Sequence, residues 1–394
     1  MLYILPVLLL LERFYFYIAD RFNIIDKPNQ RSSHAYITRR GGGIIFPVAW
    51  LIYAASTGFE YPWFTLGLLL ISAISFMDDL SEVAVGPRIS THALALFFAF
   101  YDLGVMDYFP WWGMVMVIIF SIAILNAVNF MDGINGITSM YALVFFALLS
   151  FNSGLQGADI LFDLNSPYTY IISSLLVFTF FNFRKKALCF AGDVGSVSIA
   201  YLMIGTLITQ IFPSPNNQFA VAGTFSAPGE LIDLKFLLLL SVYGVDSLLT
   251  IVHRLILKEN ILKGHRKHLY QYMANEAGVS HLAVSSLYAV SQLVISIWIL
   301  NNDVSLSQGV GIIVFLSAVY VLSKWAIMRQ YSTQPANQQA QLYMNPNSSA
   351  VSTSKFVSSR PSGPVKVVKV EPGKKIKDTK VTKKSPSYRT AEAN

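Results

Sequence analysis

The segment NAVNFMDGING at residues 126–136 places polar side chains directly after the almost purely apolar run WWGMVMVIIFSIAIL. Asn126, Asn129, Asp132 and Asn135 recur every three residues, which puts them close to one face if the helix continues. A buried carboxamide needs hydrogen-bond partners, and a buried carboxylate costs more free energy still. The pattern therefore indicates that these groups are satisfied by one another or by a ligand.

Further polar stretches follow the same pattern, because each lies beside an apolar run. They are DKPNQRSSH and TRRGGG after the first run, MDDL at the end of the third, FAGDVGS before the eighth, and GHRKHLYQ after the ninth. If they share one side of a membrane, four carboxylates would converge, those of Asp78, Asp79, Asp132 and Asp193. Such charges repel unless they are compensated. Oxygen ligands without cysteine favour a hard cation, Mg²⁺ or alternatively Mn²⁺.

The same stretches offer groups that suit phosphate. His265, Arg266 and His268 fit anionic oxygens, and the GGG and GDVGS segments both open helices whose free N–H groups can hold phosphate. Taken alone, an Asp-Asp pair, a Gly-Asp turn or a basic loop each has an ordinary structural explanation. Their occurrence together on one side indicates phosphoryl transfer involving a lipid.

The composition identifies the elements that must position these residues. The chain of 394 residues is 54% hydrophobic and only 13% charged, whereas soluble domains carry about a quarter charged residues. We therefore expect an all-α polytopic membrane protein with ten to eleven helices. A retained first helix is expected rather than a signal peptide. The eleven apolar runs that approach the length of a bilayer lie near 2–19, 43–57, 62–77, 90–104, 111–131, 137–151, 168–183, 197–212, 235–253, 281–300 and 308–328.

The distribution of Lys and Arg predicts the orientation. One set of loops holds basic residues such as Arg39, Arg40, Arg88, Arg184 and Arg266, whereas the alternate loops hold none. By the positive-inside rule, the basic loops and the polar stretches face the cytoplasm, with the N-terminus outside and the C-terminus inside. The sequence thus predicts one composite site at the cytoplasmic face of the membrane.

The C-terminal segment differs from the rest of the chain. Residues 331–394 hold 11 Lys/Arg and 3 Asp/Glu, a net charge of +8, whereas residues 1–330 carry 18 and 19, a net charge of −1. We expect a membrane domain over 1–330 and a disordered basic cytoplasmic tail over 331–394. The tail is either merely solvated or attracted to anionic lipid. No nucleic-acid partner is expected.

The ordered series DKPNQRSSH, TRRGGG, MDD, NAVNFMDGING, FAGDVGS and HRKHL, over roughly residues 20–280, resembles the polyprenyl-phosphate N-acetylhexosamine-1-phosphate transferases of glycosyltransferase family 4. The resemblance implies a bundle of ten or eleven membrane helices with a cytoplasmic active-site cleft. It also implies transfer of an N-acetylhexosamine 1-phosphate from a UDP-sugar to undecaprenyl phosphate, with release of UMP and a requirement for Mg²⁺. N-acetylglucosamine is the default sugar. The reaction would begin a cell-surface polysaccharide pathway at a bacterial inner membrane. A homodimer is expected by analogy alone.

The resemblance also implies residue roles. Asp78 matches the candidate base and Asp79 a group beside the metal, while Asp193 matches the principal metal ligand. The N-x-x-D-G-x-N segment, with Asn129, Asp132 and Asn135, would line the nucleotide and metal region. Phe190 matches an aromatic that stacks on uracil. Arg266 and His268 match the R-x-H of the diphosphate-binding loop, and His265 beside them is a further candidate for substrate binding.

Two departures leave roles open. Arg39 replaces the proline that often precedes the glycines, and Tyr270 replaces a second histidine. For the reaction we expect direct attack by the lipid phosphate, with a covalent route through Asp78 as the less favoured alternative.

Three other classes remain as alternatives. A transporter with a polar site at its cytoplasmic face is the main one, although transporter sites lie near the bilayer midplane. A CDP-alcohol phosphotransferase would carry D-G-x-x-A-R, which DGINGI does not match. A scaffold protein that has lost catalysis would not need the intact set of acidic residues.

Overall fold

A computed structural model of the chain describes residues 3–28, 33–34, 36–155, 166–212, 233–260 and 265–332. All of them belong to one compact unit, Met1–Ala350. The predicted tail, 331–394, lies outside the described residues except for its first two positions, and four residues of the DKPNQRSSH stretch, 29–32, lie outside them as well.

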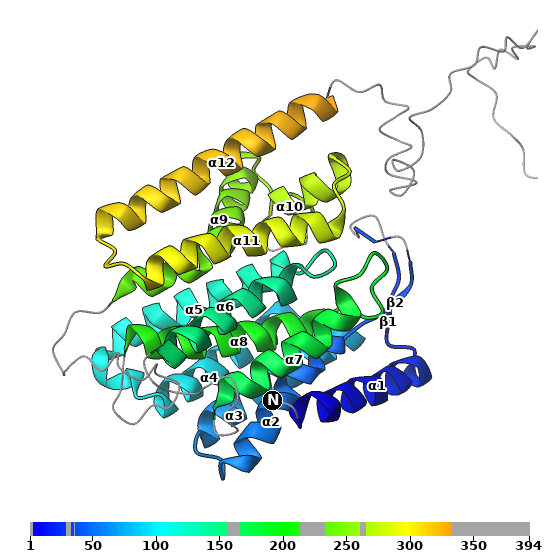
Figure 1. Cartoon of the computed structure of the whole chain (residues 1–394), viewed down its shortest axis with the longest axis vertical. Helices are drawn as coiled ribbons and strands as arrows, with labels where there is room; N and C mark the ends of the chain where they lie inside the picture. Colours follow the sequence, from blue (N-terminus) through cyan, green and yellow to red (C-terminus); the bar gives the residue numbers. More distant parts are fainter. Residues whose placement is uncertain are drawn as a thin grey trace, which may run out of the picture. The chain divides into compact units, whose positions relative to one another are not determined.

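Every apolar run predicted from the sequence is helical in the structure (Figure 1). Up to residue 212, the described residues contain eight α-helices and two short 3-10 helices: α1 (Ile4–Phe22), η1 (Gly42–Ile44), α2 (Ile45–Ser56), α3 (Pro62–Leu80), α4 (Val85–Asp102), η2 (Val105–Tyr108), α5 (Trp111–Met131), α6 (Ile137–Leu155), α7 (Pro167–Asn182) and α8 (Gly192–Ile211). From residue 233 onward, the described residues add η3 (Leu234–Leu240), α9 (Ser241–Ile256), α10 (Leu269–Gln271), a π-helical turn η4 (Tyr272–Glu276), α11 (His281–Leu300) and α12 (Leu306–Ser332).

An all-α membrane protein is confirmed, but the expected count of about eleven spans is not. Among the residues that the structure describes, six helices are both long and apolar enough to cross a bilayer: α3, α5, α8, η3 with α9, α11 and α12. The η1–α2 segment and α6 are shorter apolar helices. The first helix, α1, carries Glu12, Arg13, Asp20 and Arg21, and α7 has only 16 residues. Hydropathy therefore locates the helices correctly but does not settle how many of them span the membrane.

Helix α8 lies at the centre of the described bundle. Every residue from Val194 to Ile211 is buried, and the helix packs against α2, α3 and α5. A helix that is apolar on all sides is expected to be buried. Because α8 begins at Gly192, its N-terminus presents Asp193 beside the ends of α3 and α5. The packing of this one helix thus brings together polar stretches that lie far apart in the sequence.

A short hairpin that the sequence analysis did not predict connects α1 to η1. Strands β1 (Ile25–Asp26) and β2 (Thr38–Arg39) pair in antiparallel fashion, with Asp26 opposite Thr38. The chain then continues alongside the segment before α8. There, the Gly42 N–H donates to the Phe190 carbonyl at 2.9 Å, and the Gly43 N–H donates to the Ala191 carbonyl at 3.1 Å. A side chain at Gly43 would collide with the backbone of Gly195, so this approach requires glycine.

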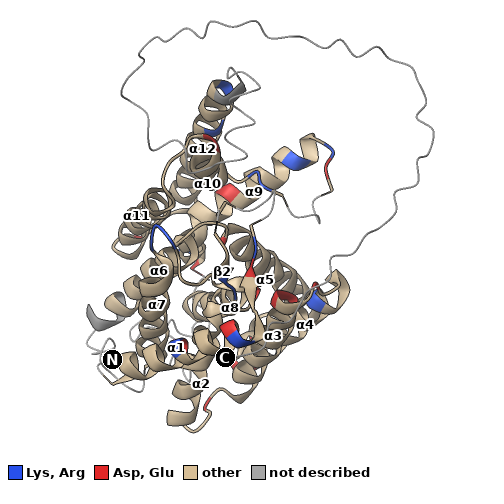
Figure 2. Ribbon diagram, turned by 90° about the vertical axis from the view of Figure 1, so that its right-hand side faces the viewer, with Lys and Arg blue, Asp and Glu red and all other residues tan. Residues whose placement is uncertain are grey.

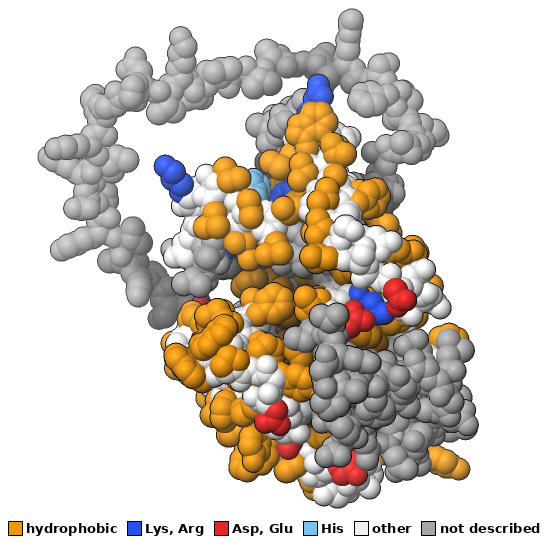
Figure 3. All heavy atoms as spheres, turned by 90° about the vertical axis from the view of Figure 1, so that its left-hand side faces the viewer, with side chains coloured by type: hydrophobic (Ala, Val, Ile, Leu, Met, Phe, Trp, Pro, Cys, Tyr) orange, Lys and Arg blue, Asp and Glu red, His pale blue; other side chains and the backbone are white. Residues whose placement is uncertain are grey.

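The surface fits a bilayer environment. Most of the helical ribbon carries neither acidic nor basic side chains (Figure 2). Hydrophobic side chains dominate the visible part of the face in Figure 3, and large apolar residues of α12, such as Phe315, Leu322 and Trp325, are exposed. Such a large exposed apolar area is expected where the hydrocarbon of a lipid bilayer covers the surface.

Candidate active site

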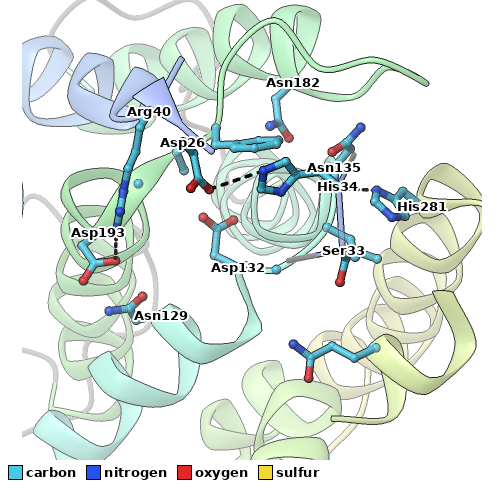
Figure 4. A pocket seen from close by; sticks show the side chains of 16 residues that line it. Asp26, Ser33, His34, Arg40, Asn129, Asp132, Asn135, Asn182, Asp193 and His281 are labelled. Carbon is cyan, nitrogen blue, oxygen red and sulfur yellow. Dashed lines mark hydrogen bonds and ion pairs between the residues drawn. The ribbon is translucent and has the colours of Figure 1, made fainter. Parts of the chain in front are cut away.

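A polar cavity of about 290 Å³ lies where the ends of several helices meet (Figure 4). Five of the residues proposed from the sequence line it: Asn129, Asp132, Asn135, Phe190 and Asp193. They come from the end of α5, the turn after it, and the segment that opens α8. The structure therefore gathers two separate motifs into one space large enough for part of a small ligand.

The end of α5 explains the three-residue spacing of polar side chains in the NAVNFMDGING segment at 126–136. The helix ends at Met131, so Asp132 and Asn135 belong to the turn before α6 rather than to one continuous helical face. Asn126 bonds its own helix, donating from Nδ2 to the Ile122 carbonyl at 2.8 Å, and it does not line the cavity. Asn129 accepts a hydrogen bond from the Ser196 hydroxyl at 3.2 Å.

The turn after α5 is held by its neighbours. The Asn135 side chain donates to the Arg184 carbonyl at 2.8 Å, and the Gly136 N–H donates to Asn182 Oδ1 at 2.6 Å. Burial, reinforced by the nearby negative charge of Asp79, raises the pKa of Asp132 to about 6. Because its surroundings stabilise the charged form of Asp132 only weakly, this carboxylate is suited to bind a cation or to accept a proton from a ligand.

Asp79 lies behind the cavity rather than on its wall. Its Oδ1 accepts from the backbone N–H of Asp193 at 2.8 Å and from Arg40 Nε at 2.6 Å, and its Oδ2 accepts from the Val194 N–H at 3.0 Å. A carboxylate at this position satisfies the free N–H groups of a helix N-terminus and interacts favourably with the helix dipole. Gly192 has φ +70°, and any side chain there would collide with Asp79. This geometry makes Asp79 the anchor of the first turn of α8.

Two arginines balance the aspartates. Arg40 Nη2 lies 3.6 Å from Asp193 Oδ1, and Arg88 Nη1 lies 2.7 Å from Asp78 Oδ2 and 3.9 Å from Asp193 Oδ2. Asp78 Oδ1 also accepts the Val83 N–H at 2.6 Å, and Asp78 does not line the cavity. Sequence analysis gave neither arginine a role, although Arg40 lies in the TRRGGG stretch and Arg88 in a basic loop.

The oxygen donors of the cavity fit a magnesium ion that arrives with phosphate. Asp132, Asp193 and Asn129 face the same space in Figure 4, but the described residues contain no preformed group of three His, Cys, Asp or Glu side chains arranged for a metal. Mg²⁺ usually takes only one or two carboxylates and completes its shell with water and substrate phosphates. Two carboxylates and a carboxamide are thus sufficient for such a shared site.

Sequence reasoning missed part of the cavity wall. Asp26, His34, Arg40, Asn182, Gln271 and His281 also line it. The imidazole of His34 lies 4.6 Å from the ring of Phe190, and its Nε2 lies 3.8 Å from Asp26 Oδ2. Asp26 and His34 stand in the quoted DKPNQRSSH stretch, so the signal was present, but only the tertiary structure shows that both line the cavity and that His34 packs against Phe190.

Residues 265–271, which we call the histidine loop, lie next to the cavity, but the site residues predicted in this loop do not line it. Tyr270, one of the two departures from the family pattern, packs against Gly133 and donates from its hydroxyl to the Phe130 carbonyl at 3.0 Å. The loop is therefore attached to the end of α5. Of its residues, Gln271 reaches the cavity wall, whereas His265, Arg266 and His268 do not.

The three residues of this loop that the sequence analysis proposed differ in their surroundings. Arg266 Nη2 lies 3.8 Å from Glu276 Oε1. Burial, with nearby positive charge, lowers the pKa of His265 to about 3, so this residue is neutral at pH 7. The rings of His265 and His268 stack at 4.9 Å. The guanidinium of Arg266 is thus a fixed positive charge in this loop, and His265 is not.

His268 is held by a residue that the sequence analysis did not identify. Its Nδ1 lies 3.1 Å from Oδ1 of Asp246 on α9, which also accepts the Leu269 N–H at 3.1 Å, while Asp246 Oδ2 accepts the Tyr288 hydroxyl at 2.7 Å. Nε2 of His268 is buried and has no hydrogen-bond partner within the described part of the chain. A carboxylate on Nδ1 fixes both the orientation and the tautomer of an imidazole.

Comparison with known proteins agrees with the series of motifs. The model of glycosyl transferase family 4 matches residues 61–211, which include all of the proposed aspartates but not the histidine loop. A decaprenyl-phosphate N-acetylglucosaminephosphotransferase of Mycolicibacterium smegmatis is 25% identical over 296 residues, covering 67% of this chain and 71% of that protein. A probable undecaprenyl-phosphate N-acetylglucosaminyl 1-phosphate transferase of Bacillus subtilis is 22% identical over 289 residues, covering 69% and 76%. A phospho-N-acetylmuramoyl-pentapeptide-transferase of Enterococcus faecalis is 26% identical over 190 residues, covering 41% and 58%.

Proposed function

We propose that this chain, whose residues 61–211 match the model of glycosyl transferase family 4, transfers an N-acetylhexosamine 1-phosphate from a UDP-sugar to a polyprenyl phosphate in the synthesis of a cell-surface polymer. The observation that carries the proposal is the convergence of Asp132, Asp193 and Asn129 in one polar cavity beside an aromatic wall. Undecaprenyl phosphate is the proposed acceptor, and UDP-N-acetylglucosamine is the default donor.

In this reaction an oxygen of the lipid phosphate attacks the phosphorus attached to the sugar. The bond from that phosphorus to the bridging oxygen breaks, and UMP leaves with the electron pair. A phosphomonoester has its second pKa near 6, so the acceptor is already largely dianionic at neutral pH and little proton removal is needed. Alignment and neutralisation of charge therefore supply most of the rate enhancement, and no enzyme nucleophile is required.

The residues divide this work by position. Phe190 and His34 form the wall on which we place the uracil ring. Asp193, Asp132 and Asn129 would hold Mg²⁺ together with the diphosphate, and the ion would neutralise charge that develops on the phosphate oxygens. Arg40 and Arg88 each lie between two aspartates and offset their mutual repulsion until substrate binds. Arg266 and His268 contribute from the adjoining loop to charge neutralisation on the departing UMP.

Asp78 and Asp79 receive modified roles. Both carboxylate oxygens of Asp79 accept hydrogen bonds, from the first backbone N–H groups of α8 and from Arg40, so we assign Asp79 the role of positioning Asp193. Asp78 holds Arg88 close to Asp193. Its proposed role as base is not needed for an acceptor that is already ionised. We place the protein in the cytoplasmic membrane of a bacterium, with the basic loops and the cavity toward the cytoplasm.

The test uses purified protein with undecaprenyl phosphate, Mg²⁺ and a panel of UDP-N-acetylhexosamines, following the release of UMP. Asp193→Asn removes the proposed ligand. Asp303→Asn is the matched control, because it makes the same change in an exposed loop. We expect UMP release that needs both lipid and metal, that persists in the control, and that falls at least a hundredfold in Asp193→Asn. Solute flux by pure protein in liposomes without UMP release would overturn the proposal in favour of a transporter.

A further inference from the structure

A second cavity, of about 550 Å³, lies between α1 and α7 and shares no lining residue with the candidate active site. Three arginines line it: Arg13 of α1, Arg39 of β2 and Arg184 after α7. Asp20 is the one acidic residue among its lining residues, so the cleft carries a net charge of +2. We call it the arginine cleft.

Each arginine of the cleft is laid over an aromatic ring. The guanidinium carbons of Arg13, Arg39 and Arg184 lie 5.7, 5.0 and 4.5 Å from the ring centroids of Phe181, Phe16 and Phe180. Stacking of this kind holds a guanidinium group by its face and leaves the N–H groups at its edge available.

The three arginines differ in how well they are paired. Arg39 binds Asp20 through two parallel hydrogen bonds of 2.7 and 2.8 Å. Arg184 donates from Nε to the Phe180 carbonyl at 2.6 Å, and neither it nor Arg13 forms an ion pair with a carboxylate within the described residues. The uncompensated charge of the cleft therefore belongs to Arg13 and Arg184.

The surroundings of the cleft are apolar and exposed. Phe14 and Tyr17 of α1 are 59% and 61% exposed, and Phe180 of α7 is 55% exposed, as expected for side chains that face lipid. A charged residue on a helix that faces lipid costs several kcal/mol unless it reaches the interface or finds a counter-ion. Arg13 lies nine residues before the end of α1, and its long side chain extends to the cleft that it shares with Arg184. An anion at the headgroup level would supply this counter-ion.

We propose that the arginine cleft binds the headgroup of an anionic phospholipid, with Arg13 and Arg184 contacting its phosphate and the Arg39–Asp20 pair forming one wall. Basic pockets between membrane helices on the cytoplasmic side bind lipid headgroups in this way, and the planar guanidinium fork matches phosphate oxygens. The substitution of Arg39 for the proline common in the family thereby acquires a role in the cleft wall. The proposal is independent of the transferase reaction.

The experiment measures the thermal unfolding midpoint of the full chain in a neutral detergent, titrated with phosphatidylglycerol or with phosphatidylcholine. Native mass spectrometry counts the lipids that remain bound. The cleft variant is Arg13→Gln with Arg184→Gln. The matched control is Arg21→Gln with Lys258→Gln, which removes the same charge from exposed residues outside the cleft.

We expect phosphatidylglycerol to raise the midpoint of the wild type and of the control, and to raise that of the cleft variant by less than half as much. Phosphatidylcholine should have little effect on any of them. An equal shift in the cleft variant and in the wild type would overturn the proposal. A shift caused by undecaprenyl phosphate but not by phosphatidylglycerol would also overturn it, because the cleft would then bind the substrate lipid.

A second variant keeps the test decisive if the double substitution fails to fold. Asp20→Asn removes the one negative charge of the cleft and leaves Arg39 uncompensated, so phosphatidylglycerol should bind more tightly and give a larger shift. An unchanged or smaller shift in Asp20→Asn contradicts the proposal, because added positive charge strengthens the binding of an anion.

Discussion

The role of Asp79 can be tested sharply, because sequence and structure assign it differently. The sequence pattern places it beside the metal, whereas the structure places its carboxylate on the N–H groups of Asp193 and Val194 and on Arg40. Asp79→Asn keeps the size of the side chain but leaves one acceptor oxygen for three donors. At least one donor then faces the amide NH₂ group instead of an oxygen.

The cost of this substitution follows from the bonds that it breaks. A hydrogen bond to a charged group contributes about 1.5–3 kcal/mol, and breaking a buried ion pair costs about 3–5 kcal/mol. The Arg40 side chain is 33% exposed and keeps Asp193 at 3.6 Å, so the lower part of that range applies. We expect the free energy of unfolding to fall by about 3 kcal/mol.

The assay compares unfolding and activity in the same detergent. Asp79→Asn should lower the thermal unfolding midpoint by several degrees and reduce UMP release together with it, because the first turn of α8 loses its anchor. Asp193→Asn should abolish UMP release while leaving the midpoint close to that of the wild type, since its carboxylate contacts the two arginines only at 3.6 and 3.9 Å. An Asp79→Asn protein that unfolds like the wild type but releases no UMP would refute this reasoning. Asp79 would then act in the reaction itself, as a group beside the metal.

Three further predictions test the surroundings of the site. Gly43→Ala should prevent stable folding, because a methyl group there collides with the backbone of Gly195. In the control variant, Gly86→Ala, the added methyl group meets no atom within 4 Å, so the unfolding midpoint should stay unchanged. Equal midpoints for the two variants would contradict the packing of η1 on α8. Burial raises the pKa of Glu276 to about 7, although the nearby charge of Arg266 opposes this shift, so between about pH 4.5 and 7 the folded state binds more protons than the unfolded state and Glu276 destabilises the fold as the pH rises. Glu276→Gln removes this titration, so its unfolding midpoint should rise relative to that of the wild type from pH 5 to pH 8. A difference between the two midpoints that does not change with pH would contradict the raised pKa. Asp246→Asn should lower the rate of UMP release by about tenfold or more, because His268 loses the carboxylate that orients it. Tyr288→Phe removes only the hydrogen bond to the other oxygen of Asp246 and should retain most of the activity. Equal losses of activity in the two variants would show that the hydrogen bonds among His268, Asp246 and Tyr288 only support the fold.

The sequence by itself determined the class of the protein and the position of its helices. Hydropathy is a local property, so each apolar run could be read directly, and each became a helix. The same holds for the motifs: Asn129, Asp132 and Asp193 were identified because the residue types and their spacing are local, and they meet in one cavity. The number of membrane spans was not determined, since α1 and α7 have too much charge or too little length to be assigned from hydropathy alone.

Only the tertiary structure decided which of these groups pair with one another. Asp79 bonds the N–H of Asp193 across 114 positions of sequence, and nothing local distinguishes this anchor from the neighbouring Asp78, which holds Arg88. Likewise, the pairing of His268 with Asp246 depends on how α9 packs beside the histidine loop. Hydrogen bonds and ion pairs between distant residues depend on packing, and packing is a property of the whole chain. For that reason the sequence could name the candidate site residues, while the structure separates those that line the cavity from those that lie behind it.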